Sequence, residues 1–225
     1  MLKTRIPQPK GRRASASSGE LQTACLLSPE FFARPPRGVA RALLGKLLMR
    51  REGDELLAGR IVETEAYLGQ ADPAAHAAAG RTARNSVLFG PPGHAYIYFI
   101  YGNHFCLNVS CLPPGEAGCV LLRALEPVMG TGLMAHNRGL GPSRTGTAAR
   151  LLTSGPGRLC QAFAITRLRD NSKDLTAPAS DLTLWDDGFR PRHIVSTPRI
   201  GITKAAEAML RFYITGNRFV SGKRD

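Results

Sequence analysis

The chain has 225 residues, a length typical of one folded domain with or without a terminal extension. Hydrophobic residues make up 43% of it, which is enough to bury a core and excludes wholesale disorder. The formal net charge of +13 favours a polyanionic partner, either nucleic acid or an acidic membrane surface. The sequence contains no run of about 20 apolar residues, so we expect no membrane-spanning helix.

Residues 1–24 differ in composition from the rest of the chain. Five basic residues stand there against one acidic residue, Glu20, among Ser, Gly and Pro. Too little apolar material is present for this segment to fold alone, so we predict a flexible basic arm (1–24) followed by one domain (25–225). The Arg and Ser bias also resembles an organellar import sequence, and a tether to DNA or an idle tail fits equally well.

The first elements of the domain follow from capping signals and apolar spacing. Residues 28–30, Ser-Pro-Glu, are typical of a helix start, and residues 39–48 carry apolar side chains at helical spacing. Residues 47–51 then indicate a strand. A turn follows at Gly53-Asp54, and residues 58–67 return as a second strand.

The second half of the chain alternates loops with short elements. Residues 71–93 are rich in Ala, Gly, Pro and Arg, which predicts a functional loop, and residues 129–149 are rich in Gly and Arg, which predicts a surface loop. Residues 94–111 form the strongest predicted strand pair, reversing at Gly102-Asn103. Further expected elements are a helix at 158–165 and strands at 120–125, around Trp185, and at 194–195, 199–202 and 211–214.

These elements show neither an internal repeat nor βαβ alternation. We therefore predict the α+β class: a single compact domain with a mainly antiparallel sheet, peripheral helices and a protruding β-hairpin.

The five cysteines do not indicate a disulfide scaffold, because their number is odd and no CxxC pair is present. His104, Cys106 and Cys111 lack the two close ligand pairs typical of structural zinc. We interpret these thiols as small buried residues and expect no metal ion and no other cofactor.

The predicted strand 61–67 has an unusual face. Side chains alternate along a strand, so Glu63, Glu65 and Tyr67 share one face. Two carboxylates and a ring are poor core material, but they suit a site where the ring holds something flat and a carboxylate deprotonates water. The alternative is a solvated strand edge.

The hairpin contains a second unusual feature. Four of the five tyrosines lie between positions 67 and 101. Core packing accounts for Tyr96, Ile97, Phe99 and Ile100. Tyr101 precedes the reversal, where a large ring is exposed, and an exposed wedge at a hairpin tip is a device for separating stacked base pairs.

Six stretches carry a family resemblance: 59–69 (GRIVETEAYLG), 84–85 (RN), 96–102 (YIYFIYG), 121–127 (LLRALEP), 154–156 (SGP) and 159–162 (LCQA). In this order they resemble the alkyladenine (3-methyladenine) DNA glycosylase family, and the similarity spans residues 30–215. The resemblance implies a DNA repair enzyme, a monofunctional hydrolase that starts base-excision repair. It would flip alkylated or deaminated purines (the 3-methyladenine, 7-methylguanine, hypoxanthine and ethenoadenine class) out of duplex DNA and hydrolyse the N-glycosidic bond.

The resemblance also implies the partner and the location. The partner would be double-stranded DNA approached from the minor groove, with no membrane contact and the protein a monomer. The location would be cytoplasmic or nuclear, with organellar import by the N-terminal arm left open.

Catalytic roles are carried over on the matched positions. Glu65 would be the general base that activates water, and Arg123 would help to hold that water or balance the charge of the base. Tyr101 would fill the gap left in the duplex. On the residues alone, Arg123 equally suits a structural ion pair with Glu63.

Base-binding roles are carried over in the same way. Tyr67, His76 and Tyr98 would form the stacking walls. Asn108 would stand where the exocyclic amine of guanine would otherwise lie, and Leu121 would shape the pocket floor. Without the family match, His76 is equally an ordinary loop histidine.

Lysine usage bears on lyase chemistry. Bifunctional glycosylases need an amine nucleophile, and no lysine occurs between Lys46 and Lys173, a span that holds every candidate residue. We therefore predict simple hydrolysis. The alternative function is a noncatalytic nucleic-acid-binding protein using the same basic surface and aromatic hairpin, although a carboxylate beside stacking rings would repel phosphates. A membrane-surface protein lacks an amphipathic anchor and is set aside.

Overall fold

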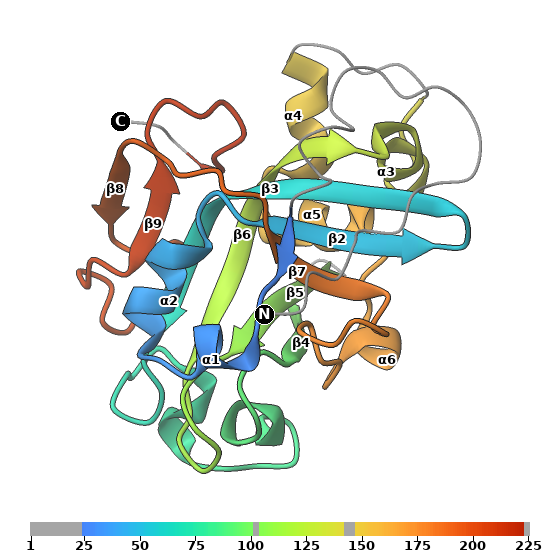
Figure 1. Ribbon diagram of the computed structural model, residues 1–225. Helices are drawn as coiled ribbons and strands as arrows, with labels where there is room; N and C mark the ends of the chain where they lie inside the picture. The colour runs from blue at the N-terminus through green and yellow to red at the C-terminus, as the bar shows by residue number, and fades with distance from the viewer. Residues whose placement is uncertain (1–23, 101–103, 142–146, 223–225) are drawn as a thin grey trace.

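The computed structural model describes residues 24–100, 104–141 and 147–222. The expected arm (1–24, except Ala24) and the expected intercalating Tyr101 lie outside these residues. The described residues form a nine-stranded sheet, in which seven strands follow the order β1-β7-β2-β3-β6-β5-β4, β9 pairs with β3, and β8 pairs with β9 (Figure 1). Each pairing of named strands is antiparallel, so the predicted α+β class is confirmed.

The strands are β1 (Cys25–Leu26), β2 (Leu47–Glu52), β3 (Glu55–Tyr67), β4 (Ala95–Ile100), β5 (His104–Ser110), β6 (Cys119–Met129), β7 (Leu182–Asp186), β8 (Ile194–Thr197) and β9 (Arg211–Ile214). The α-helices are α1 (Pro29–Phe32), α2 (Pro36–Leu43), α3 (Thr131–Asn137), α4 (Thr147–Thr153), α5 (Pro156–Ala162) and α6 (Arg167–Asp170), and two 3₁₀ helices are η2 (His76–Ala79) and η3 (Ser86–Phe89). Within the described ranges, no helix has the length and apolar character needed to cross a membrane.

The consecutive apolar residues of β2 reflect a sheet covered on both faces. Leu48 packs into the main core, whereas Leu47 and Met49 pack with Trp185 in a second core. Because neighbouring side chains point to opposite faces, three apolar residues in a row are needed where neither face meets water.

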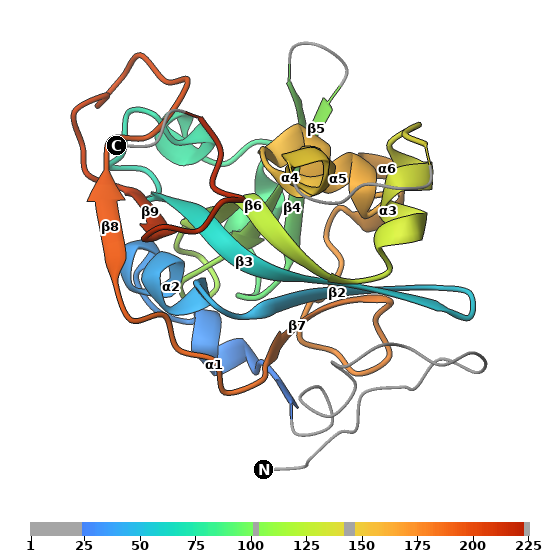
Figure 2. The same cartoon turned by 90° about the horizontal axis from the view of Figure 1, so that it is seen from above.

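The helices fall into two groups around the sheet. Figure 2 shows α1 and α2 on one side and α4, α5 and the protruding β4–β5 hairpin on the other. On the first side, Val39 and Leu43 of α2 are fully buried, and Thr64 of β3 donates a hydrogen bond to the Ala40 carbonyl at 2.9 Å. This bond ties α2 to the half of β3 that carries the candidate residues.

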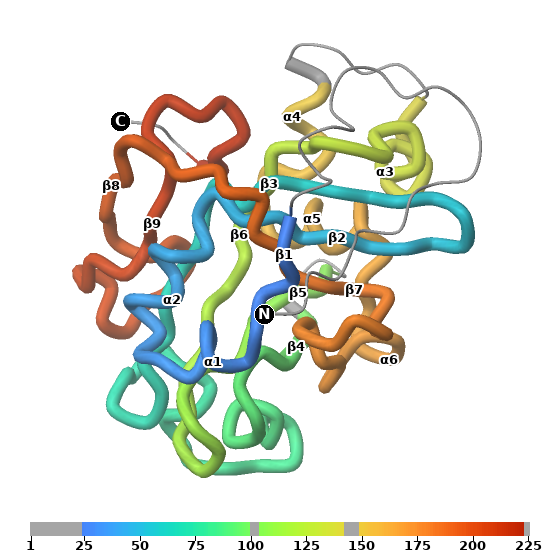
Figure 3. Tube along the Cα trace, viewed as in Figure 1, coloured from blue at the N-terminus to red at the C-terminus, as the bar shows by residue number. Residues whose placement is uncertain are grey.

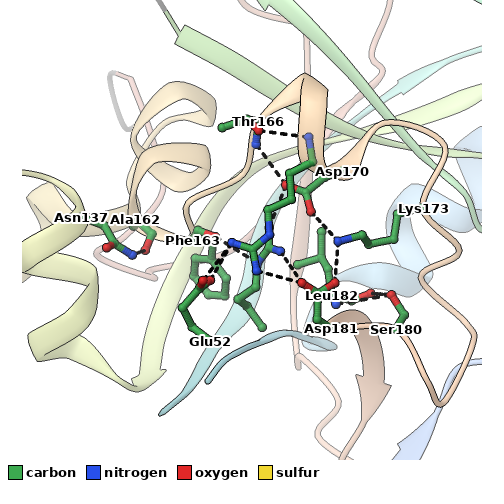
Figure 4. A network of polar contacts seen from close by, with 12 residues as sticks. Glu52, Asn137, Ala162, Phe163, Thr166, Asp170, Lys173, Ser180, Asp181 and Leu182 are labelled. Atoms are coloured by element: carbon green, nitrogen blue, oxygen red, sulfur yellow. Dashed lines mark hydrogen bonds and ion pairs between the residues drawn. The ribbon is translucent and has the colours of Figure 1, made fainter. Parts of the chain in front are cut away.

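A buried ion network holds the far end of β2 (Figure 4). The Arg50 side chain is fully buried and binds Asp170 at 2.8 Å and Asp181 at 3.1 Å, while its Nε donates to the Phe163 carbonyl. Lys173 bridges the same two carboxylates. The network fastens α6 and the segment before β7 to the sheet.

Two sequence-based expectations were wrong. The expected surface loop 129–149 contains α3, because Met134 and Ala135 pack into the core while Gly130, at a φ of +77°, starts the helix. The expected strand 199–202 is not a strand, because Arg199 leaves the sheet to form a buried ion pair with Asp72.

Candidate active site

The candidate residues meet where β3 lies between β6 and β9. In the strand register, Glu65 stands opposite Leu121 of β6 and Arg211 of β9. Register shifts on either side of Glu63 mark an irregular, bulged segment, a feature often found next to active sites because it re-aims side chains.

The Glu65 carboxylate is fully buried and accepts three hydrogen bonds or ion pairs. The Tyr67 hydroxyl donates to Oε2 at 2.9 Å, and the backbone N–H of Ile200 donates to Oε1 at 2.8 Å. Arg123 Nη1 lies 3.1 Å from Oε1. Because a carboxylate has about four acceptor positions, one on Oε2 is left for a further donor.

Arg123 joins both carboxylates of the strand. Its Nε lies 3.2 Å from Glu63 Oε1, in addition to the contact with Glu65. Burial acts to lower the pKa of Arg123, but the charges of Glu65 and Glu63 outweigh it and raise that pKa. The structural pairing with Glu63 and a place beside Glu65 therefore coexist.

Glu63 is occupied by structural partners. Arg211 Nε donates to it at 2.7 Å and the Ser221 N–H at 2.6 Å. The shared face of Glu63, Glu65 and Tyr67 is confirmed, since Arg123 contacts both carboxylates and Tyr67 contacts Glu65. The alternative of a solvated strand edge is wrong, because both carboxylates have no exposed surface.

Four aromatic side chains form a group that reaches Glu65 through Tyr67. The His76 and Tyr98 rings lie edge to face with centroids 4.5 Å apart, and His76 Nδ1 is 2.9 Å from the Tyr96 hydroxyl. Tyr67 and Tyr98 pack against the small cluster that contains Tyr96. Of the aromatic residues described, Tyr67 contacts Glu65 directly. His76 and Tyr98 are connected to Glu65 through Tyr67 and this cluster.

Burial shifts the pKa of the tyrosine hydroxyls and of the imidazole in this group. It raises the pKa of the Tyr98 and Tyr67 hydroxyls, which therefore remain protonated and able to donate. It lowers the pKa of His76, and the charge of Arg84 acts in the same direction. The imidazole is therefore neutral at neutral pH.

Asn108 and Leu121 form a row with the carboxylate across three strands. Asn108 of β5 stands opposite Leu121 of β6, which stands opposite Glu65 of β3. The Asn108 amide is buried, donating to the Tyr96 carbonyl at 3.3 Å and accepting from the Cys119 thiol at 3.8 Å.

The hairpin prediction needs one correction. Tyr96 and Ile97 are buried, but Phe99 was interpreted as core and is 50% exposed. It packs edge to face on Phe105 across the hairpin, with ring centroids 5.3 Å apart, so the two rings cover each other near the hairpin tip. Tyr101 lies outside the described residues.

Three residues of the site were missed by sequence reasoning: Asp72, Arg199 and Ile200. The Arg199 guanidinium lies 4.7 Å from the Tyr67 ring centroid and pairs with Asp72, a residue 127 positions away. Figure 3 shows the segment after β8 beside the loop after β3. No local pattern signals this pairing, because nothing near Arg199 in the sequence indicates its distant partner.

The described ranges contain no cluster of metal-ligating side chains. There, no three His, Cys, Asp or Glu side chains lie together in a way that could hold a metal ion. The Glu65 carboxylate, next to the aromatic group, can take up a proton.

Similarity to known proteins gives the class of this chain. Residues 30–218 match the family described as Methylpurine-DNA glycosylase (MPG). A Koribacter versatilis protein named "Putative 3-methyladenine DNA glycosylase" is 64% identical over 194 residues, covering 86% of this chain and 92% of that protein. A Methanoculleus marisnigri protein of the same name is 48% identical over 201 residues, covering 87% and 98%. The mouse "DNA-3-methyladenine glycosylase" is 47% identical over 208 residues, covering 87% of this chain and 61% of the mouse protein.

The match covers most of the described residues, so the chain is a DNA glycosylase, a hydrolase of base-excision repair. The chain belongs to the methylpurine-DNA glycosylase family. This confirms the resemblance drawn from the sequence motifs.

Proposed function

We propose that the protein releases alkylated and deaminated purines, with 3-methyladenine foremost, from double-stranded DNA, and that Glu65 is the general base. The observation that carries this proposal is the Glu65 carboxylate, buried and oriented by Tyr67, Ile200 and Arg123 beside an aromatic group. The names of the relatives support 3-methyladenine as a substrate.

The proposed reaction is a hydrolysis. Glu65 takes a proton from a water molecule whose oxygen forms a bond to C1′ of the sugar. The bond from C1′ to the base nitrogen breaks, and its electron pair leaves with the purine. An alkylated purine that carries positive charge leaves as a neutral base, so the bond breaks more readily, whereas an uncharged purine leaves as an anion that takes up a proton from water. Arg123 fixes the carboxylate and balances its charge.

Base recognition is proposed to rest on stacking against Tyr67, His76 and Tyr98. Stacking on aromatic rings contributes about 1–3 kcal/mol per base, comparable with the few kcal/mol needed to unstack it. The electron-rich ring faces attract flat cations such as 3-methyladenine. The lowered pKa of His76 keeps that ring neutral, so it does not repel them.

Base selection and strand separation complete the proposal. Asn108 penalises normal guanine at its exocyclic amine, and Leu121 beside it shapes the floor of the pocket. Tyr101 fills the gap left in the duplex after a minor-groove approach.

Simple hydrolysis without lyase activity is proposed from the positions of the lysines. Lys46 pairs with Asp186 at 2.7 Å, and Lys173 binds Asp170 and Asp181 in the network of Figure 4. Neither amine is among the contacts of Glu65. Borohydride trapping of a covalent enzyme–DNA adduct would contradict this.

The proposal also covers the oligomeric state, the location and the N-terminal arm. We propose that the protein acts as a monomer on double-stranded DNA in the cytoplasm or the nucleus, without a membrane partner. The basic arm at residues 1–24, ahead of the domain at 25–225, is proposed to be a nonspecific tether to DNA or an import signal.

The test uses duplexes that each carry one modified purine, scored for release of the base. We expect Glu65→Gln to reduce the rate about 10²- to 10⁴-fold, the usual contribution of a general base, while lesion binding is retained. Glu55→Gln, at the exposed start of the same strand, is the matched control and should act like the wild type. Unchanged release by Glu65→Gln would remove this residue from the mechanism. Tight binding of undamaged single strands by the wild type, with no release from any duplex, would instead support a noncatalytic binder.

A further inference from the structure

A buried cation lies against one face of the proposed stacking wall. The Arg199 side chain has no exposed surface, and its guanidinium carbon is 4.7 Å from the centroid of the Tyr67 ring. Its Nη1 donates to the Ala66 carbonyl at 3.0 Å. Since Arg199 covers one face of the ring, an extruded base can stack only on the other face.

Asp72 holds this cation in place. Its two carboxylate oxygens bind the two terminal nitrogens of Arg199. The same oxygens accept the N–H groups of Leu68 and Ala74, each at 3.1 Å. The pair therefore joins the end of β3, the loop that leads to His76 and the segment after β8.

The position next to Arg199 bears directly on the general base. Ile200 donates its backbone N–H to Glu65 at 2.8 Å. One ion pair therefore fixes both the ring proposed to stack on the base and a hydrogen bond to the carboxylate proposed to activate water.

The charge of Arg199 persists at working pH. Burial acts to lower its pKa, but the hydrogen bonds and charge of Asp72 outweigh burial and raise that pKa. A ring attracts a cation through the negative potential above its face. A cation already on one face weakens that potential on the other, so a positively charged base gains less from stacking there. The stacking of an uncharged base depends little on this effect.

We propose that Arg199, oriented by Asp72, is a specificity-determining residue that narrows the preference of the site for cationic over neutral purines. This inference rests on the proposed function. Arg199 thereby lets the pocket accept neutral hypoxanthine or ethenoadenine, although the other rings of the pocket favour cations.

The test compares two duplexes of identical sequence, one with 7-methylguanine (cationic) and one with hypoxanthine (neutral), in single-turnover assays of the full chain. The measured quantity is the ratio of the two release rates. We expect Arg199→Gln to raise the ratio of 7-methylguanine to hypoxanthine release about fivefold, the size of a partly desolvated cation–ring interaction. A purely structural role would lower both rates and leave the ratio unchanged.

Two further variants separate charge from structure. Arg199→Lys keeps the charge but loses the planar fork, so we expect slower release of both bases with a ratio near that of the wild type. Arg60→Gln is the matched control, because Arg60 also binds an aspartate through both terminal nitrogens (Asp187) and lies 4.4 Å over a ring (Phe189). Its loss should leave the ratio unchanged.

The outcomes are distinct. An unchanged ratio in Arg199→Gln, or an equal change in Arg199→Lys, overturns the inference while leaving the proposed function intact. A wild type that releases neither base overturns the inference, and one that also fails to release 3-methyladenine refutes the proposed function. Thermal unfolding shows whether Arg199→Gln is folded. If it is not, Arg199→Met, which keeps an apolar stem against Tyr67, takes its place with the same expected rise.

Discussion

Two glutamates on one face of β3 have different partners and, we propose, different tasks. Glu63 is held by two arginines and a backbone N–H, and none of these partners is a ring of the aromatic group. Glu65 has one arginine, a tyrosine hydroxyl and a backbone N–H. The chemical role is therefore assigned to Glu65 and the structural role to Glu63.

Glu63→Ala tests the structural half of this division. The change leaves Arg211 without its buried carboxylate and the Ser221 N–H without an acceptor, so we expect the free energy of unfolding to fall by about 3–5 kcal/mol. Urea denaturation measures it, with Glu65→Gln as the comparison because glutamine still accepts from Tyr67. A loss below about 1 kcal/mol for Glu63→Ala would show that the network is replaceable.

His76 links the site to pH. Its lowered pKa means that the ring gains a proton only below the ordinary value of about 6.5. The protonated ring would repel a cationic base, so we expect release of 7-methylguanine to fall more steeply than release of hypoxanthine as the pH drops below that value. Rate–pH profiles for both lesions check this, and His76→Asn should remove the difference between them. Parallel profiles in the wild type would contradict the proposed contact between His76 and the base.

At the scale of elements, the end of β3 is shaped by a close approach. Gly69 follows Tyr67 by two positions, has a φ of +92°, and a Cβ there would collide with the Ala117 carbonyl oxygen. Only glycine suits both conditions, because an L side chain is strained at this φ and has no room. The turn that directs the chain toward Asp72 and His76 therefore depends on this residue.

Gly69→Ala should displace this turn. We expect the free energy of unfolding to fall by more than about 1–2 kcal/mol, which is the cost of placing alanine in the left-handed conformation. We also expect lesion binding to weaken. Gly80→Ala is the control, since Gly80 has a φ of +83° but no atom within 4 Å of an added Cβ, so only the conformational cost applies. Thermal unfolding and lesion-binding titrations measure both variants. Equal losses in the two would mean that the contact with Ala117 is unimportant.

At the scale of the whole molecule, a strong positive charge is combined with buried carboxylates that are ion-paired throughout the described residues. The half-buried Asp181 shows what such pairing does to a pKa. Burial acts to raise its pKa, but hydrogen bonds from Lys173 and Arg169 outweigh burial and lower the pKa to about 2. The folded state therefore holds the ionised form more strongly than the unfolded chain does.

Acid should therefore destabilise the protein in a defined range. The unfolded pKa of an aspartate is about 3.9, so the contribution of Asp181 is complete above that value and is lost as the pH falls toward about 2. We expect Asp181→Asn to be less stable than the wild type at neutral pH and to lose less stability between pH values of about 4 and 2. Urea unfolding at several pH values measures both. An identical pH dependence in the two proteins would rule out this origin.

The sequence alone determined much of this protein. The alternation along β3 placed Glu63, Glu65 and Tyr67 on one face. The turn residues predicted the β2–β3 hairpin, and the family motifs predicted the glycosylase family. These features depend on neighbours a few positions apart, where backbone geometry links residue spacing to direction.

Only the tertiary structure decided the remainder. The ion pair of Asp72 with Arg199 and the hydrogen bond from Ile200 to Glu65 join residues more than 120 positions apart. The short helix α3 also took its form from packing against the core rather than from local pattern. Such contacts depend on how the sheet and its loops come together, and a buried charge finds its partner through that assembly rather than through its position in the sequence.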